Sequence, residues 1–230
     1  MTAIFITATG TDVGKTFVAA SLIRHLREMG RDVEAIKPIV VGYEPAQAAA
    51  SDPGVLLAAL GLPFSPEAVE RISPWRFGAG LSPELAARHE GRDIDVDRVV
   101  AYCQNAIAQR RDILLIDGVD GIMVPLDEHR TILDVMMTLH LPLILVAGSY
   151  NGTISHTLTA LDSLFRRDMN ILATIVSETP GSTVPLDDVV STISRYTEPV
   201  IGVPRQQRSG SDPSAGWTLS SLFNPRGRRA

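Results

Sequence analysis

Cysteine and long apolar runs are nearly absent from this sequence. The 230 residues include one cysteine, Cys103, which excludes an intrachain disulfide and a metal site built from several cysteines. Because Cys103 lies in a helical pattern, we expect it to be a small core residue. The longest apolar run, Leu141–Ala147, is far too short to span a bilayer, and no signal-type apolar stretch follows a basic N-terminal region. These absences predict a soluble, cytoplasmic protein without a membrane partner.

An excess of positive charge is also missing. The formal net charge is −5 at pH 7, which argues against nucleic acid as a main partner. An anionic ligand would therefore need a local positive site. The histidines show no metal-ligand spacing, and the sequence shows no Ser/His/Asp arrangement. With 45% hydrophobic residues the chain can form a sizeable core, and its length is that of one large domain.

One stretch, Ala8–Thr16, carries the clearest chemistry. It follows an apolar run and precedes an amphipathic segment, which is the strand, loop and helix order of a phosphate-binding loop. Its last residues, Gly14–Thr16, offer backbone N–H groups, a lysine charge and a hydroxyl that can ligate Mg²⁺. Thr9 stands where a strict motif has its first glycine, so an ordinary strand-to-helix turn is the alternative. The local context favours nucleotide phosphate binding.

Apolar runs typical of strands alternate with amphipathic segments along the chain. The expected strands are Ala3–Thr7, Asp32–Lys37, Ile113–Ile116, Leu143–Ala147, Ile171–Val176 and Val200–Val203. The expected helices are Lys15–Met29, one that begins at Ser51, Ser82–Gly91, Val96–Arg110, Ile154–Phe165 and Leu186–Tyr196. This alternation predicts an α/β fold, a mostly parallel central sheet with helices on both faces. We expect one domain over residues 1–204 and a tail, 205–230, that is loosely ordered or partly docked through Trp217, Leu219 and Leu222.

Polar residues that follow the strands are expected to converge on the phosphate loop, because ligands bind outside the carboxyl ends of parallel strands. Lys37 ends the second strand, where it would hold an anionic substrate or a developing negative charge; the alternative is a solvent-facing lysine. Asp117 directly follows the third strand, like the acidic residue that places Mg²⁺ in P-loop enzymes; the alternative is turn chemistry. Asp52 is either a helix cap or a second carboxylate for Mg²⁺.

Together these motifs resemble the dethiobiotin synthetase family over nearly the whole chain, up to Pro204. The matching segments, in order, are Thr9–Thr16, Ala35–Gly42, Ser51–Asp52, Ser82–Gly91, Asp117–Leu126 and Asn151–His156. The resemblance implies an ATP- and Mg²⁺-dependent ligase of biotin biosynthesis, which joins 7,8-diaminononanoate and CO₂ into dethiobiotin. One amine becomes a carbamate, ATP activates it as a carbamic–phosphoric anhydride, and the second amine closes the ring.

The resemblance also implies a role for each residue that matches a motif. Lys15 would hold the outer phosphates, and Lys37 would stabilise the carbamate and the transferring phosphoryl group. The implied Mg²⁺ ligands are Thr16, Asp52 and Asp117. The implied ATP contacts are Asp12, Val13, Gly14, Lys15, Thr16, Phe17, Asp52, Asp117, Gly118, Val119, Asp120, Ser177, Glu178, Val203, Pro204 and Arg205. The implied substrate contacts are Thr11, Lys37, Val41, Gly118, Val119 and Ser155. The family forms homodimers with the active site near the subunit interface, close to the stretch that matches Asn151–His156.

Several residues depart from the family pattern. Asp117 replaces a glutamate, and Asp120 replaces a glycine, which brings a negative side chain near phosphate or carbamate. Val41, Ser155 and Ser177 replace residues that contact the substrate or the adenine edge. A diverged, weakly active member of the family is therefore one alternative.

Two other classes of enzyme or switch are alternatives. A switch ATPase of the partitioning type usually has a further lysine early in the phosphate loop, and residues 7–10 contain none. An amidoligase acting on a large cofactor precursor requires a glutamine-hydrolysing domain, for which the chain has no room, although a partner could supply it. Both classes fit the sequence less well than the ring-closing ligase.

Overall fold

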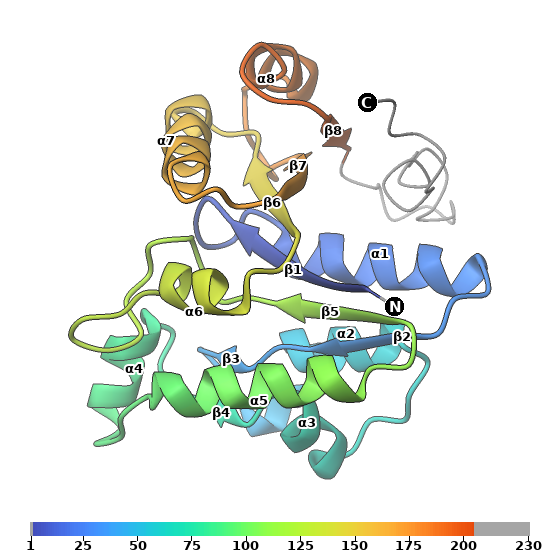
Figure 1. Ribbon diagram of the computed structural model, residues 1–230, viewed down its shortest axis with the longest axis vertical. Helices are drawn as coiled ribbons and strands as arrows, with labels where there is room; N and C mark the ends of the chain where they lie inside the picture. The colour runs from blue at the N-terminus through green and yellow to red at the C-terminus, as the bar shows by residue number, and fades with distance from the viewer. Residues whose placement is uncertain (1, 205–230) are drawn as a thin grey trace.

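Six parallel strands form the central sheet, in the order β2-β5-β1-β6-β7-β8 (Figure 1). The computed structural model describes residues 2–204. The strands are β1 (Thr2–Ala8), β2 (Val33–Ile36), β5 (Ile113–Asp117), β6 (Leu143–Gly148), β7 (Ile171–Ser177) and β8 (Val200–Val203). Every residue of β5 and β6 is buried, as expected for strands of a parallel sheet that is covered on both faces. The predicted fold class is confirmed.

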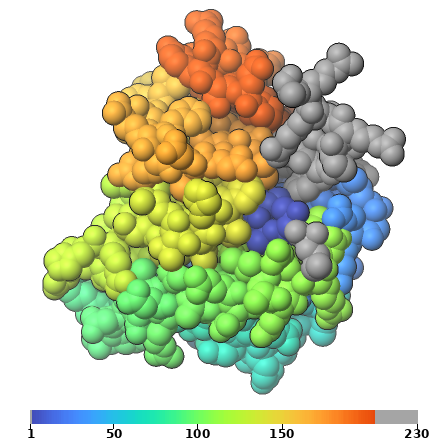
Figure 2. All heavy atoms as spheres, viewed as in Figure 1, coloured from blue at the N-terminus to red at the C-terminus, as the bar shows by residue number. Residues whose placement is uncertain are grey.

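Helices follow most strands and return the chain to the same edge of the sheet. They are α1 (Lys15–Glu28), α2 (Asp52–Ala59), α3 (Pro66–Ile72), α4 (Pro83–His89), α5 (Val96–Gln109), α6 (Ile132–Leu139), α7 (Thr153–Phe165) and α8 (Leu186–Ile193), with a 3₁₀ helix, η1 (Pro45–Ala50). In Figure 1, α1 and α2 lie on one face of the sheet, and α5 and α6 lie on the other. The side chains of α5 and α6 cover the sheet on the face seen in Figure 2. None of the helices in residues 2–204 has the length and apolar character needed to cross a membrane.

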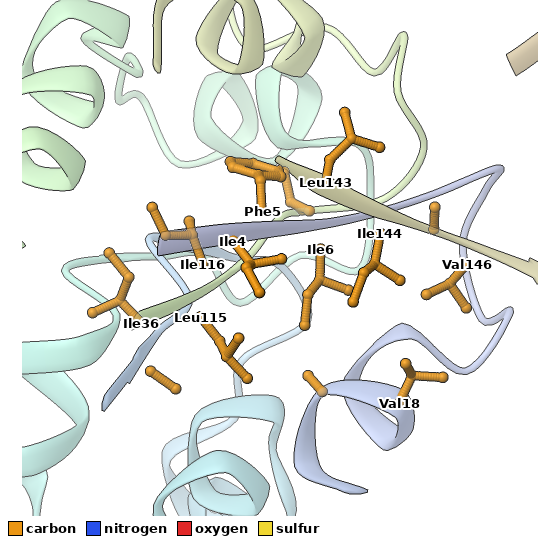
Figure 3. Close-up of a cluster of buried hydrophobic side chains, with 14 of the residues drawn as sticks. Ile4, Phe5, Ile6, Val18, Ile36, Leu115, Ile116, Leu143, Ile144 and Val146 are labelled. Carbon is orange, nitrogen blue, oxygen red and sulfur yellow. The ribbon is translucent and has the colours of Figure 1, made fainter. Parts of the chain in front are cut away.

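Alternating side chains of β1 fix α1 against the sheet. Ile4 and Ile6 point to the side of Val18 in α1, whereas Phe5 points to the opposite side (Figure 3). All four side chains are buried, and burying one such side chain fully contributes about 1.5–3 kcal/mol. Cys103 is also fully buried, as predicted. This packing holds the loop between β1 and α1 at the carboxyl edge of the sheet.

Four elements, β3, β4, α6 and α8, differ from the sequence prediction. A second sheet of two very short parallel strands, β3 (Ile39–Val40) and β4 (Trp75–Arg76), was not predicted, because two residues are too few to show a period. The helix α6 was also missed, since its run is almost entirely apolar. Its start is marked by a capping box between Thr131 and Asp134, a signal that the sequence does carry. The last helix ends at Ile193 rather than at residue 196. The predicted tail and its apolar residues lie outside the described part of the chain.

Candidate active site

The loop between β1 and α1 is shaped by Gly14. This residue has φ +90°, in the left-handed region, and directly precedes the first residue of α1. A Cβ atom at Gly14 would lie 2.6 Å from Ser177 Oγ at the end of β7, so only glycine fits here. The loop therefore lies against the ends of two strands, and the N-terminus of α1 directs its free N–H groups toward an anion.

Two lysines converge on Asp117 at the end of β5. Lys15 Nζ donates to the carbonyl oxygen of Gly118 at 2.7 Å and lies 3.3 Å from Asp117 Oδ1. Lys37 Nζ donates to the same carbonyl at 3.0 Å and to Asp117 Oδ2 at 3.0 Å. The sheet order explains this arrangement, because Lys15 and Lys37 follow the two strands that flank β5. The predicted convergence is confirmed, and the alternative of a solvent-facing Lys37 is wrong, since its side chain is 2% exposed.

These two lysines are the only ones in the 230-residue sequence; the other basic side chains, apart from histidine, are arginines. Every lysine of the chain therefore lies in one site. An ammonium group is a compact point charge, and it suits a phosphate oxygen or a carbamate oxygen that changes position during a reaction.

Asp52 and Thr16 complete the cluster. Asp52 is the first residue of α2, and its Oδ2 lies 3.1 Å from Lys37 Nζ. The residue at the cap position is Ser51, so the helix-cap interpretation of Asp52 is not supported. Thr16 Oγ1 donates to Asp117 Oδ2 at 3.3 Å.

Burial and charge act differently on the two lysines. Burial would lower the pKa of Lys37, but the charges of Asp117 and Asp52 outweigh it and raise that pKa above its usual value. For Lys15 burial prevails over the attraction of Asp117, and its pKa falls to about 8. Burial would raise the pKa of Asp52, but Lys37 and then Lys15 lower it. Near neutral pH Lys37 is therefore charged, and Lys15, whose pKa is lowered, is the lysine that loses its proton more easily as the pH rises.

Two cavities lie along the phosphate loop. The first, of about 430 Å³, is lined by Gly10, Thr11, Asp12, Gly14, Lys15, Thr16, Phe17, Lys37, Val40, Val41, Gly42, Ala50, Ser51, Asp52, Val119 and Asp120. The second, of about 290 Å³, is lined by Asp12, Val13, Gly14, Phe17, Ser177, Glu178, Thr179 and Pro180. Asp12, Gly14 and Phe17 line both, so one elongated ligand can occupy the two together.

The oxygen atoms near the loop fit Mg²⁺. Thr16, Asp52 and Asp117 offer one hydroxyl and two carboxylates, and Mg²⁺ prefers such hard oxygen ligands. Asp117 Oδ1 is buried and accepts no hydrogen bond from the described residues, although Lys15 Nζ lies nearby. No cluster of three His, Cys, Asp or Glu residues able to hold a metal occurs in residues 2–204. A bound Mg²⁺ would therefore need phosphate oxygens and waters as further ligands.

The structure does not bring every predicted residue to these cavities. Ser155 is exposed on the first turn of α7 and lines neither of them. Val203 is buried at the end of β8, where its carbonyl oxygen accepts from the N–H of Glu178 at 2.8 Å. Pro204 is exposed, and Arg205 lies outside the described residues.

Sequence reasoning missed several lining residues. Gly10, Val40, Gly42, Ala50, Thr179 and Pro180 were not named as site residues. Thr179 has a clear structural role, because Thr179 and Ser149 exchange two hydrogen bonds of 3.0 Å between the ends of β7 and β6. The glycines carried the only usable signal, through their motif positions.

Comparison with known proteins identifies the family. A family model described as an AAA domain matches residues 2–210. The ATP-dependent dethiobiotin synthetase BioD of Methylobacterium nodulans is 42% identical over 94% of this chain and 97% of its own length. The corresponding protein of Phenylobacterium zucineum is 45% identical over 89% of this chain and 87% of its own length.

Solved structures support the same fold at much lower identity. A chain of the MinC:MinD cell division protein complex of Aquifex aeolicus has a TM-score of 0.53 and 16% identity, and the match covers 90% of this chain and 82% of that one. The signal recognition particle receptor FtsY of Elizabethkingia anophelis has a TM-score of 0.50 and 16% identity, over 90% of this chain and 59% of that one. Because these identities are low, the likeness concerns the fold alone. With its phosphate loop, its lysine pair and its close relatives, this chain belongs to the family of ATP-dependent dethiobiotin synthetases, which are ligases.

Proposed function

We propose that this chain catalyses the ATP-dependent carboxylation and ring closure of 7,8-diaminononanoate, which gives dethiobiotin, ADP and phosphate. Family membership supports the reaction class. The single observation that carries the proposal is the lysine pair: Lys15 and Lys37 both line the first cavity and share two partners, the Gly118 carbonyl and Asp117. Such a pair can hold phosphates and a carbamate side by side.

The reaction needs positioning and charge stabilisation more than covalent help from the protein. One substrate amine adds to CO₂ and loses a proton to give the carbamate. A carbamate oxygen attacks the γ-phosphorus of ATP, and ADP leaves. The second amine, in its neutral form, then attacks the carbamoyl carbon, and it loses a proton as phosphate leaves and the ring closes. In each step negative charge moves from one oxygen atom to another. Lys37 stays positively charged and is therefore suited to stabilise that charge on each of them.

The nucleotide would span the two cavities. Its phosphates would lie at the N-terminus of α1, near Gly14, Lys15 and Thr16, and its base would lie in the second cavity near Ser177 and Glu178. The remaining proposed contacts are Asp12, Val13, Phe17, Val203, Pro204 and Arg205. The two cavities share the lining residues Asp12, Gly14 and Phe17, which supports a single ligand that occupies both.

We propose Mg²⁺ as the metal of the site. Thr16, Asp52 and Asp117 would hold it, and it would neutralise charge on the outer phosphates. Asp117 would then bind the metal in place of one of its ion pairs with Lys15 and Lys37. A loss of diamine-dependent turnover on chelation, restored by added Mg²⁺, is the expected result.

The substrate would lie in the first cavity, against Thr11, Val41 and Val119. The Gly118 backbone, which the lysines hold through its carbonyl oxygen, remains a proposed contact beside that cavity. Ser155 is exposed, which suits a contact with substrate held by a neighbouring subunit, so we propose a homodimer with the active site near the interface. We further propose that residues 1–204 are one domain and that the protein is cytoplasmic. Sedimentation of the full chain would test the dimer.

The decisive experiment measures ADP release from ATP with Mg²⁺ and bicarbonate, with and without 7,8-diaminononanoate. The proposal expects release that depends strictly on the diamine, with dethiobiotin detected by mass. ADP release without the diamine would instead indicate a switch ATPase and would contradict the proposal. Absence of both ADP release and product from folded, ATP-binding protein would contradict it as well.

A further inference from the structure

Asp120 occupies an unusual backbone position in the loop after β5. Its φ is +45°, a left-handed value that glycine adopts readily, asparagine and aspartate occasionally, and most other residues rarely. The loop also packs tightly on the phosphate loop, because a Cβ atom on Gly121 would lie 3.2 Å from the backbone of Gly10. The loop after β5 thus lies against the phosphate loop, and Asp120 lines the first cavity. A strained aspartate in a binding cavity points to a function.

The carboxylate of Asp120 is held from one side only. Thr11 Oγ1 donates to Asp120 Oδ1 at 3.1 Å, which joins the loops that follow β1 and β5. Within residues 2–204, no other hydrogen bond and no ion pair to the Asp120 side chain is formed. Two other acidic groups near the lysines, Asp52 and Asp117, are both paired with Lys37. Asp12 also lines the cavity and forms no ion pair within residues 2–204, but no hydrogen bond of the described residues orients its carboxylate as Thr11 orients that of Asp120. Asp120 therefore brings a negative charge to the cavity that no described cation balances.

We propose that Asp120 binds an amine of the diamine substrate in its protonated form, with Thr11 fixing the orientation of the carboxylate. The inference rests on the proposed function, since it names the part of that substrate which the residue recognises. An alkylammonium has three donors, and a half-buried carboxylate is a matching acceptor. Phosphate and carbamate would be repelled by the same group. The cavity thus has a cationic wall, formed by Lys15 and Lys37, and two carboxylates without an ion pair in residues 2–204, those of Asp12 and Asp120. Only the carboxylate of Asp120 is oriented by a side-chain hydrogen bond among those residues.

The first test replaces Asp120 by asparagine. Asp120→Asn keeps the size of the side chain, keeps an oxygen that can accept from Thr11, and tolerates the left-handed backbone. It removes only the charge. We expect the KM for 7,8-diaminononanoate to rise about ten-fold or more, as for loss of one charge-assisted hydrogen bond, while the KM for ATP stays within about two-fold.

A matched control is offered by Asp168, which has φ +52° and is exposed between α7 and β7. Asp168→Asn makes the same chemical change at another left-handed aspartate that lines neither cavity. It should leave both KM values unchanged. A merely structural role of Asp120 would appear instead as a lower melting temperature with an unaltered diamine KM, and that result would overturn the proposal.

Two inhibitors separate recognition of the amines from recognition of the tail. 1,2-Diaminopropane carries the amines alone, and nonanoate carries the tail and its carboxylate alone. Asp120→Asn should weaken inhibition by 1,2-diaminopropane and leave inhibition by nonanoate unchanged. Equal loss of both, a higher kcat with tighter ATP binding, or an altered Mg²⁺ requirement would each overturn the assignment.

The proposal can fail independently of the proposed reaction. Calorimetric titration of 1,2-diaminopropane into the full chain, with a non-hydrolysable ATP analogue present, needs no turnover. Weaker binding to Asp120→Asn than to the unaltered chain supports the amine site even where dethiobiotin is not formed. Equal binding overturns it even where dethiobiotin is formed.

Discussion

Lys15 and Lys37 donate to the same acceptor, the carbonyl oxygen of Gly118, at 2.7 Å and 3.0 Å. Two ammonium groups that share one oxygen repel each other, and Asp117 offsets that repulsion because it lies 3.3 Å from Lys15 Nζ and 3.0 Å from Lys37 Nζ. The site is thus arranged around positive charge before a ligand binds. An incoming phosphate would relieve the repulsion as well as gain its own contacts, which favours anion binding at this place.

The two lysines should differ in their reactivity toward acylating reagents. Acylation requires the neutral amine, and the pKa of Lys15 is lowered to about 8 by burial, against the attraction of Asp117. The pKa of Lys37 is raised, because Asp117 and Asp52 outweigh its burial. As pH rises toward 8 in metal-free buffer, Lys15 should lose its proton first and be acylated first, as read by peptide mass spectrometry.

The same labelling experiment has an internal control. In denaturant both lysines are exposed and should be acylated at similar rates. If Lys15 were still acylated faster than Lys37, the difference would come from the neighbouring residues in the sequence rather than from the fold. Bound ATP should raise the pKa of Lys15 and slow its acylation. Faster acylation of Lys37 than of Lys15 in the folded chain would contradict this account of the site.

Replacement of Lys37 should cost both stability and activity. Lys37→Met leaves the buried Asp117 without one of its partners, and loss of a buried partner costs at most roughly 3–5 kcal/mol of unfolding free energy. We expect less than this limit because Lys15 remains 3.3 Å from Asp117. Turnover should fall by about 100-fold or more. Denaturant unfolding measures the first effect, and ADP release measures the second.

A second substitution separates these two effects. Lys37→Met combined with Asp117→Asn should regain part of the stability, because the uncompensated carboxylate is gone. It should regain no turnover. Recovery of turnover in the double variant would show that Lys37 serves only to neutralise Asp117.

Much of the fold could be predicted because its strands are continuous apolar runs. Residues 113–116 and 143–147 are short runs rich in isoleucine, leucine and valine, which is typical of strands buried on both faces, and the alternation with helices then implies a parallel sheet. The meeting of Lys15, Lys37 and Asp117 followed from one rule, that the carboxyl ends of parallel strands share an edge.

The remaining features depend on contacts between distant segments. The pairing of β3 with β4 brings together residues separated by more than thirty positions, and neither strand has a recognisable period. The bond between Thr11 and Asp120 joins residues 109 positions apart. The left-handed backbone of Asp120 could not be predicted from its residue type either. A glycine suggests a positive φ, whereas an aspartate does not. These features come from tertiary packing, which a local pattern does not report.

Cys103 should be inert in the folded chain. Burial raises the pKa of its thiol to about 12, so the reactive thiolate is scarce at pH 8. A disulfide reagent should therefore modify Cys103 only after unfolding. The thiol has a pKa of 9.0 in the unfolded chain and about 12 in the folded chain. The protonated thiol therefore contributes its full stabilisation of the folded state below pH 9, and this stabilisation is lost as the pH rises toward about 12. Fast labelling of the native chain at pH 8 would contradict the buried position.

Gly14 and Gly30 offer a matched test of the phosphate loop. Both have positive φ, +90° and +75°, but a Cβ atom at Gly14 would lie 2.6 Å from Ser177 Oγ, while one at Gly30 would have no atom within 4 Å. Gly30→Ala should therefore cost only the left-handed strain, about 1–2 kcal/mol. Gly14→Ala should cost more, because Ser177 or the loop must also move, and it should weaken ATP binding, which Gly30→Ala should not. Equal losses of stability with equal ATP affinity would mean that the contact with Ser177 does not shape the loop.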